Sequence, residues 1–161
     1  MKLIPLSRGL FAKVDDADFA ELSRFKWSAV KTKAGFYAVR TERGFEAIGR
    51  KRRCILMHRV LTQPQGRQVV DHQDRDTLNN QRSNLRVCSQ SENMLNAPSH
   101  RDSVSRFKGV SLHKGTGKWA AQFRHRKLGL YPTEEAAAAA YNRAALEHSA
   151  EFARPNCLEE V

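Results

Sequence analysis

The sequence predicts an α+β protein built from two small modules. Short stretches with the alternating pattern of strands are separated by short helical patterns along the whole chain. A proline followed by small and polar residues interrupts these patterns near residue 98. We therefore expect a first module over residues 1–97, a linker over 98–102 and a second module over 103–157. The second should be a three-stranded antiparallel sheet packed on one helix.

The charge of the chain indicates the kind of partner. Its 161 residues include 28 Lys and Arg against 17 Asp and Glu, a net charge of +11. An excess of this size favours nucleic acid over a membrane surface, because no basic amphipathic helix is visible. The alternative is a basic protein whose charge serves only its solubility.

Cysteine usage and hydropathy indicate the cellular compartment of the protein. The three cysteines, Cys54, Cys88 and Cys157, have no paired spacing, which favours a reducing compartment and argues against a structural zinc site. No stretch is apolar over the length that a membrane span needs, and residues 1–14 carry no signal-peptide core. We expect a soluble, cytoplasmic protein without a membrane partner.

The first module begins with a small β-rich extension. Residues 16–25 should form a helix, because acidic residues stand at its start and Phe19, Leu22 and Phe25 follow at helical spacing. Nine basic and two acidic residues lie between residues 31 and 59, which makes this segment a candidate DNA-contact surface. Strands are expected at residues 4–6, 10–14 and 35–41.

Residues 68–97 predict a strand–loop–strand–helix finger. Two strands, at 68–72 and 84–88, enclose a loop rich in Asp, Asn and Ser, which favour irregular turns. Ser89 and Glu92 have the spacing of a capping box, so a helix should start at Gln90 and stop before Pro98.

This finger carries the side chains that phosphodiester hydrolysis requires. His72 has the pKa range of a general base, and oxygens of Asp71 and Asn93 suit a hard cation such as Mg²⁺ or Mn²⁺. Adjacent residues of a regular strand point to opposite faces, so Asp71 and His72 can face one phosphate only if the strand end bends.

The segment VDHQDRDTLNNQRSNLRVCSQSEN resembles the HNH nucleases, in particular the homing endonucleases associated with phage introns. The resemblance implies a ββα-metal finger in which His72 is the base and Asp71 and Asn93 are metal ligands. It implies that Asn84, the middle residue of this catalytic set, clamps the loop. Upstream, His58 contacts the phosphate or packs beneath the finger, and Arg59 is the favoured phosphate contact.

The second module shows strand alternation around a tight turn. Strands are expected at 106–113, 118–126 and 127–131, followed by a helix from Thr133 with Glu134 and Glu135 in its first turn. Alternation along 118–126 separates an apolar face with Trp119 and Phe123 from a polar face. The residues expected on that polar face are Lys118, Gln122, Arg124 and Arg126.

The patterns KGV, GKWAA, LGLY and EEAAAAAYNRAA resemble the DNA-binding domain of plant ethylene-response factors. The resemblance implies that the sheet enters the major groove of DNA. Ser111, His113, Thr116 and Lys127 depart from the plant pattern, so the plant base preference does not carry over. The contacts implied by position are Lys108, Ser111, His113, Lys118, Gln122, Arg124, His125 and Lys127.

Together these features predict a metal-dependent DNA endonuclease of the homing type, which nicks one strand or cleaves both. Its partner should be double-stranded DNA, with no small-molecule cofactor, and we expect a monomer in the cytoplasm of a bacterial or phage-infected cell. One alternative is a DNA-binding regulator whose finger is catalytically silent. Another is a protein that binds or cleaves RNA, but the chain lacks exposed aromatic pairs for stacking unpaired bases.

Overall fold

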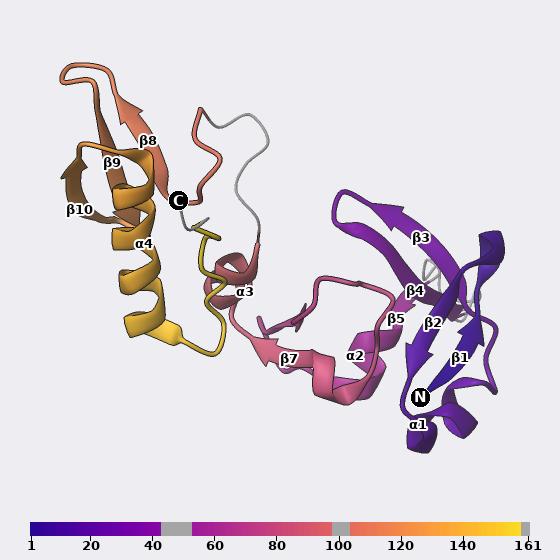
Figure 1. Cartoon of the computed structure of the whole chain (residues 1–161). Coiled ribbons are helices and arrows are strands. Elements are labelled where there is room, and N and C mark those ends of the chain that lie inside the picture. The colour runs from indigo at the N-terminus through magenta and orange to yellow at the C-terminus, as the bar shows by residue number, and fades with distance from the viewer. Residues whose placement is uncertain (43–52, 98–103, 159–161) are drawn as a thin grey trace. The chain divides into compact units, whose positions relative to one another are not determined.

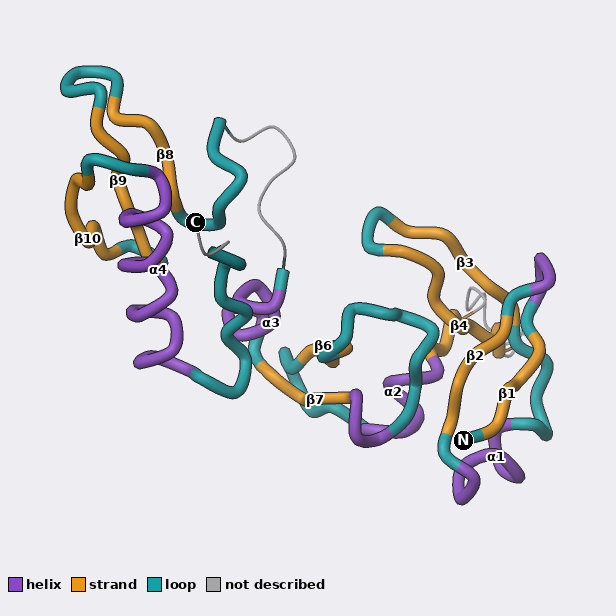
Figure 2. The backbone as a smooth tube through the Cα atoms, in the orientation of Figure 1, coloured by secondary structure: helices purple, strands orange, loops and turns teal. Residues whose placement is uncertain are grey.

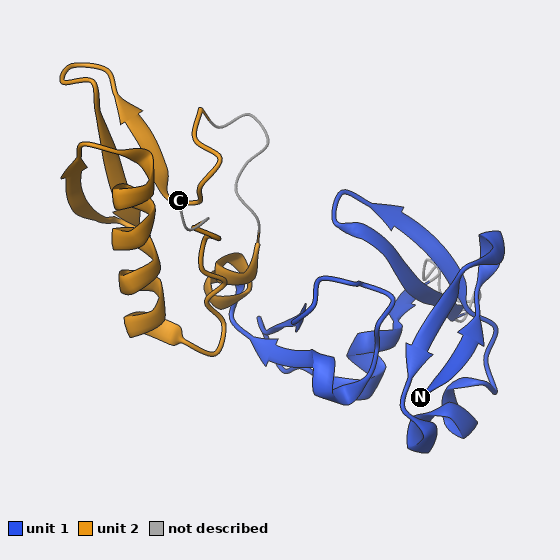
Figure 3. Ribbon diagram, in the orientation of Figure 1, with its two compact units in different colours: residues 1–90 blue, residues 91–161 orange. Residues whose placement is uncertain are grey.

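The computed structural model describes residues 1–42, 53–97 and 104–158. Small antiparallel sheets and short helices make the chain α+β, as predicted (Figures 1 and 2). The chain divides into two compact units, residues 1–90 and residues 91–161 (Figure 3). The predicted linker at 98–102 lies outside the described residues, and the division between the units falls ahead of it, inside the expected finger.

The first unit contains three small antiparallel sheets. A hairpin of β1 and β2 is followed by a sheet in the order β3-β4-β5 and by a hairpin of β6 and β7. Its elements in chain order are β1 (Lys2–Pro5), a 3-10 turn (Ser7–Gly9), β2 (Phe11–Val14), α1 (Asp16–Leu22), β3 (Ser28–Thr32), β4 (Gly35–Glu42), β5 (Arg53–Leu56), α2 (Met57–Thr62), β6 (Val69–His72), a 3-10 turn (Arg82–Asn84) and β7 (Leu85–Cys88).

One apolar core joins the N-terminal extension to the hairpin of the finger. Ile4, Val14 and Trp27 from the extension belong to the same buried cluster as Met57 of α2 and Leu85 of β7. Each large apolar side chain that is fully buried stabilises the fold by about 1.5–3 kcal/mol. The extension therefore supports the hairpin directly and is not a separate domain.

Helix α1 is shorter than its sequence pattern predicts. It ends at Leu22, whereas helical spacing of apolar residues continues to Phe25. The indole Nε1 of Trp27 donates a hydrogen bond of 2.8 Å to the carbonyl of Leu22. The amide of Phe25 donates to the same carbonyl at 3.2 Å, so both bonds satisfy a carbonyl at the helix end that has no intrahelical partner.

The second unit is a three-stranded antiparallel sheet with a helix along one face (Figure 1). Its strands have the order β10-β9-β8, and α4 packs on them. Thr133 caps α4, because its hydroxyl accepts a hydrogen bond of 3.1 Å from the amide of Ala136. Helix α3 (Gln90–Asn96) begins at the division between the units, followed by β8 (Val110–His113), β9 (Lys118–Phe123), β10 (Arg126–Tyr131) and α4 (Glu134–Ser149).

Strand β8 starts four residues later than the pattern predicts because of Gly109. This residue has φ of +73°, a conformation that favours glycine. A Cβ atom there would lie 2.1 Å from the ring of Tyr141 and 2.6 Å from the carbonyl oxygen of Gln122. The glycine of the KGV pattern thus bends the chain and lets α4 approach the sheet.

The prediction that Arg124 and Arg126 lie on the polar face of the sheet was wrong. Strand β9 stops at Phe123, and Arg124, with φ of 54°, forms a two-residue turn with His125. The turn places Arg126 opposite Phe123 and Lys127 opposite Gln122. Cross-strand neighbours share a face, so Arg126 lies on the side of α4 and Arg124 leaves the strand altogether.

Candidate active site

Asp71 and His72 end strand β6, and both are buried, each with 4% of its surface exposed. Tyr37 of β4 lies near both of them. Its ring centroid is 6.0 Å from that of His72, and burial together with the charge of Asp71 raises the pKa of its hydroxyl.

The environment of His72 keeps its imidazole neutral. Burial lowers the pKa of His72 below its usual value of 6.5, against opposing effects of a hydrogen bond with Asn80 and of the charges of Asp74 and Asp71. A neutral imidazole at pH 7 can accept a proton from water, which a general base must do.

Asn80 is a site residue that sequence reasoning treated as part of the loop. Its side chain is 1% exposed and hydrogen-bonds with His72, while its Nδ2 donates to the carbonyl of Leu78 at 3.1 Å. The bond raises the pKa of His72. This is the effect expected when a ring N–H of the histidine donates to the amide oxygen of Asn80. Asn80 therefore orients the imidazole and fixes which ring nitrogen carries the proton.

Of the two positions considered for His58, the structure supports packing beneath the finger. Its side chain is 6% exposed, and its ring centroid lies 5.5 Å from that of Tyr37. Burial, with smaller effects of His72 and Arg59, lowers the pKa of His58 to about 3. His58 is therefore a neutral packing partner of His72.

Asp71 makes a buried ion pair across the hairpin. Its partner in the strand register is Arg86, whose guanidinium Nη2 donates to Asp71 Oδ2. The side chains of the two residues are only 5% and 11% exposed. The pair compensates the charge of a carboxylate that would be costly to bury alone.

The carboxylate of Asp71 also determines whether the site suits a divalent cation. Its oxygens are the hard donors that Mg²⁺ prefers, so the donor chemistry fits, although Arg86 neutralises the same group here. Among the described residues, no group of three or more His, Cys, Asp or Glu side chains could hold a metal ion. Asn93 lies on α3 in the second unit, and its role as a ligand stays a prediction.

Asn84 has the contacts of a loop clamp. Its Oδ1 accepts from the amide of Asp74 at 2.9 Å, and its Nδ2 donates to Asp74 Oδ1 at 2.9 Å and to the carbonyl of Asn79 at 2.8 Å. These bonds close the loop between β6 and β7 at its base. Burial raises the pKa of Asp74, but hydrogen bonds from the side chain of Asn79, the amide of Asp76 and the side chain of Asn84 together lower it below its usual value.

The N-terminal extension holds the same loop from outside, which the sequence did not indicate. Lys13 of β2 bonds to the loop through its main chain, and its Nζ lies 2.9 Å from Asp76 Oδ2. Arg82 donates to both carboxylate oxygens of Asp18 at 2.8 Å. The hydroxyl of Thr77 donates to the carbonyl of Phe36 at 2.6 Å. The segment between β6 and β7 is thus bonded to β2, α1 and β4 of the extension.

Arg59 is exposed on α2, as a phosphate contact must be. It lines a cavity of about 450 Å³ together with Arg40 and Arg53. The basic segment predicted over residues 31–59 includes residues 43–52, which lie outside the described part of the chain.

The second unit presents part of the predicted DNA-contact set on the face away from α4. Pairing of His113 with Lys118 and of Lys127 with Gln122 places these residues on one face of the three-stranded sheet. Ser111 shares that face, opposite Ala120. Four predicted contacts have side-chain bonds within the unit. Arg124 Nη1 lies 2.7 Å from His148 Nε2 of α4, and the Lys108 ammonium bonds to main-chain carbonyls. Gln122 Nε2 donates to the carbonyl of Arg124 at 2.8 Å, and His113 Nδ1 lies 2.9 Å from Thr116 Oγ1.

A neutral, buried histidine beside a carboxylate at the end of a β-hairpin is an arrangement suited to hydrolysis of phosphate esters. Residues 64–95 match the sequence model of the HNH endonuclease family. The chain is also similar to an uncharacterized HNH endonuclease of Acanthamoeba polyphaga mimivirus, with 29% identity over 160 residues, covering 98% of this chain and 80% of the viral protein. These similarities indicate a nuclease.

No solved structure matches the chain. Within the described residues, no helix is long and apolar enough to cross a membrane.

Proposed function

We propose that the protein is a metal-dependent endonuclease that hydrolyses phosphodiester bonds of duplex DNA. The observation that supports this most is the setting of His72. Its imidazole is neutral and is hydrogen-bonded by Asn80. The residue ends strand β6 beside Asp71, inside the segment that matches the HNH endonucleases.

In the proposed reaction, His72 removes a proton from a water molecule, and the resulting hydroxide attacks phosphorus in line with the leaving 3′-oxygen. Asn80 orients the base, and Arg59 neutralises a non-bridging phosphate oxygen. Asp71 and Asn93 are the proposed ligands of Mg²⁺ or Mn²⁺, which when bound offsets charge on the phosphate and on the leaving oxygen. Asn84 acts through the loop that it clamps.

The C-terminal sheet is the proposed site-selecting element of a homing-type nuclease. Its face away from α4 combines an amide side chain, Gln122, that can read a base edge with lysines that suit phosphate. The segment from residue 101 to 127 holds eight basic residues and one acidic residue, which favours DNA on this side. The proposed contacts are Ser111, His113, Lys118, Gln122 and Lys127.

A plasmid-nicking assay separates this proposal from a DNA-binding regulator with a silent finger. The wild-type chain should nick or linearise supercoiled plasmid with Mg²⁺ and should lose this activity in EDTA. The variant His72→Ala should lose about 10²–10⁴-fold in rate, the usual contribution of a general base, and should still bind DNA. The exposed His148 offers a control, since His148→Ala should cleave normally.

The ligand roles are tested by metal titration. Asp71→Ala and Asn93→Ala should each raise the Mg²⁺ concentration needed for half-maximal cleavage. An unchanged titration would remove that residue from the metal site, and full activity of His72→Ala would remove His72 from the mechanism.

A further inference from the structure

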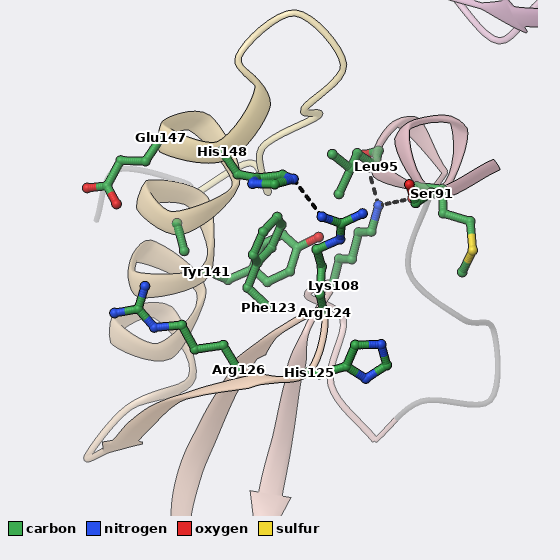
Figure 4. A pocket seen from close by; sticks show the side chains of 12 residues that line it. Ser91, Leu95, Lys108, Phe123, Arg124, His125, Arg126, Tyr141, Glu147 and His148 are labelled. Carbon is green, nitrogen blue, oxygen red and sulfur yellow. Dashed lines mark hydrogen bonds between the residues drawn. The ribbon is translucent and has the colours of Figure 1, made fainter. Parts of the chain in front are cut away.

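The end of helix α3 is bonded to a lysine of the C-terminal module. The Nζ of Lys108 donates to the carbonyls of Met94 at 2.5 Å and Leu95 at 2.9 Å (Figure 4). It also donates to the carbonyl of Ala97 at 3.0 Å. An ammonium has three donors, so these bonds use all of them. The last carbonyls of a helix have no intrahelical partners and carry partial negative charge, which a lysine in this position satisfies.

Apolar packing holds the same helix end. Leu95 is buried in a cluster with Phe123 of β9 and with Tyr141 and Ala145 of α4. Its carbonyl also accepts a hydrogen bond of 3.3 Å from the amide of Arg154. Helix α3 is therefore part of the packed second unit, although it contributes the end of the segment that matches the HNH endonucleases.

The lysine is itself held in place. Its amide donates to Asn156 Oδ1 at 2.8 Å, and Asn156 Nδ2 donates to its carbonyl at 3.2 Å. Asn156 is fixed in turn by two hydrogen bonds with Asn142 of α4, of 2.7 and 2.9 Å. The backbone and the ammonium of Lys108 are thus both tied within the second unit, on the wall of a cavity of about 890 Å³ that Figure 4 shows.

We propose that Lys108 is a positioning residue for cleavage, because it anchors the helix that carries Asn93 to the DNA-binding module. Asn93 directly precedes Met94, whose carbonyl Lys108 holds. This inference rests on the proposed function. It gives the C-terminal module a second task, the support of a metal ligand, in addition to the selection of DNA.

The full-length variant Lys108→Met tests this assignment, because it keeps the apolar stem and removes the three donors. We expect amide hydrogen exchange in residues 91–96 to become about tenfold faster, as loss of hydrogen bonds at a helix end predicts. At saturating DNA, the Mg²⁺ concentration for half-maximal nicking should rise by about 10–100-fold, the usual effect of removing support behind a metal ligand. Lys108→Arg should restore most of both properties.

Lys114, in the exposed turn between β8 and β9, provides the matched control. Lys114→Met removes the same charge and should leave exchange in α3 and the Mg²⁺ titration unchanged. If Lys108 instead contacts a DNA phosphate, Lys108→Met should bind DNA more weakly, with the salt slope of binding reduced by about one. Amide exchange in α3 should then be unchanged. That result would overturn the proposal.

Two further outcomes keep the inference separate from the nuclease proposal. If the wild-type chain cuts no DNA with any divalent cation, the proposed function fails, and with it the positioning role, whereas the exchange data still test the anchor. Faster exchange without a change in metal requirement would reduce Lys108 to a structural residue and would refute positioning. If Lys108→Met does not fold, Asn156→Ala loosens the backbone of Lys108 and should shift both readouts in the same direction.

Discussion

The imidazole ring of His58 lies edge-on against the ring of His72, with 5.2 Å between their centroids and an interplanar angle of 87°. Both rings are buried, and in both burial lowers the pKa. A proton on either ring would be repelled by one on the other and would lose hydration. The pair therefore links the stability of the finger to pH.

The first prediction follows from the pKa of His58, which burial lowers to about 3 from 6.5. His58 of the unfolded chain binds a proton below about pH 6.5, whereas His58 of the folded chain binds one only near its lowered pKa of about 3. The stabilising contribution is therefore complete above pH 6.5 and is lost as pH falls. The free energy of unfolding should drop by about 2–4 kcal/mol from this residue between pH 7 and pH 4.

The measurement is urea unfolding at several pH values. His58→Phe keeps an aromatic ring and should flatten the pH dependence in this range, while the exposed His148→Phe should follow the wild-type curve. Parallel curves for wild type and His58→Phe would contradict the assigned pKa.

The second prediction concerns Asn80. Asn80→Ala removes the partner that orients His72, so cleavage should slow by about tenfold to a hundredfold, part of the 10²–10⁴-fold that a general base contributes. DNA affinity should be unchanged. Asn79→Ala is the control, because the side chain of Asn79 bonds to Asp74, with Nδ2 to Oδ2 at 2.7 Å.

Long-range ¹H–¹⁵N correlation spectra provide a readout that does not depend on activity. Wild type and Asn79→Ala should show one imidazole tautomer of His72, and Asn80→Ala should show a mixture. One unchanged tautomer in all three proteins would contradict the role of Asn80.

The third prediction concerns the ion pair of Asp71 and Arg86. Either single change, Asp71→Ala or Arg86→Met, leaves a buried charge without its counterion and should destabilise the fold by about 3–5 kcal/mol. The double variant should recover a large part of that loss, because no buried charge then remains. Additive losses in the double variant, measured by chemical unfolding, would mean that the two groups do not interact.

The local patterns of the sequence predicted the elements of the site. Strand β6 with Asp71 and His72 and the irregular loop after it followed from propensities over a few residues. Asn84 as the clamp followed from the family resemblance. The sheet and helix of the second unit followed from alternation and helical spacing. In each case the determining interactions lie close in the sequence.

What the sequence did not predict depends on pairs that are distant along the chain. Lys13 and Asp76 lie 63 residues apart, and nothing local to either indicates the other. The burial of His58 results from the packing of α2 against neighbouring strands, which periodicity alone does not place. The face of Arg126 depended on a two-residue turn, and a shift of one residue in strand phase reverses every side chain after it.

The last prediction tests that turn and the proposed DNA-contact face together. Lys118 pairs with His113 on the face away from α4, whereas Arg126 pairs with Phe123 on the side of α4. Lys118→Ala should weaken binding to all duplexes alike and reduce the salt slope by about one, as loss of one phosphate contact does. Gln122→Ala should cost about 1–3 kcal/mol on the preferred site and relax the preference at one base pair. Arg126→Ala should change neither property.

Binding titrations at several salt concentrations, on target and scrambled duplexes, separate these outcomes. Loss of site preference in Arg126→Ala with none in Gln122→Ala would show that DNA approaches the opposite side of the sheet.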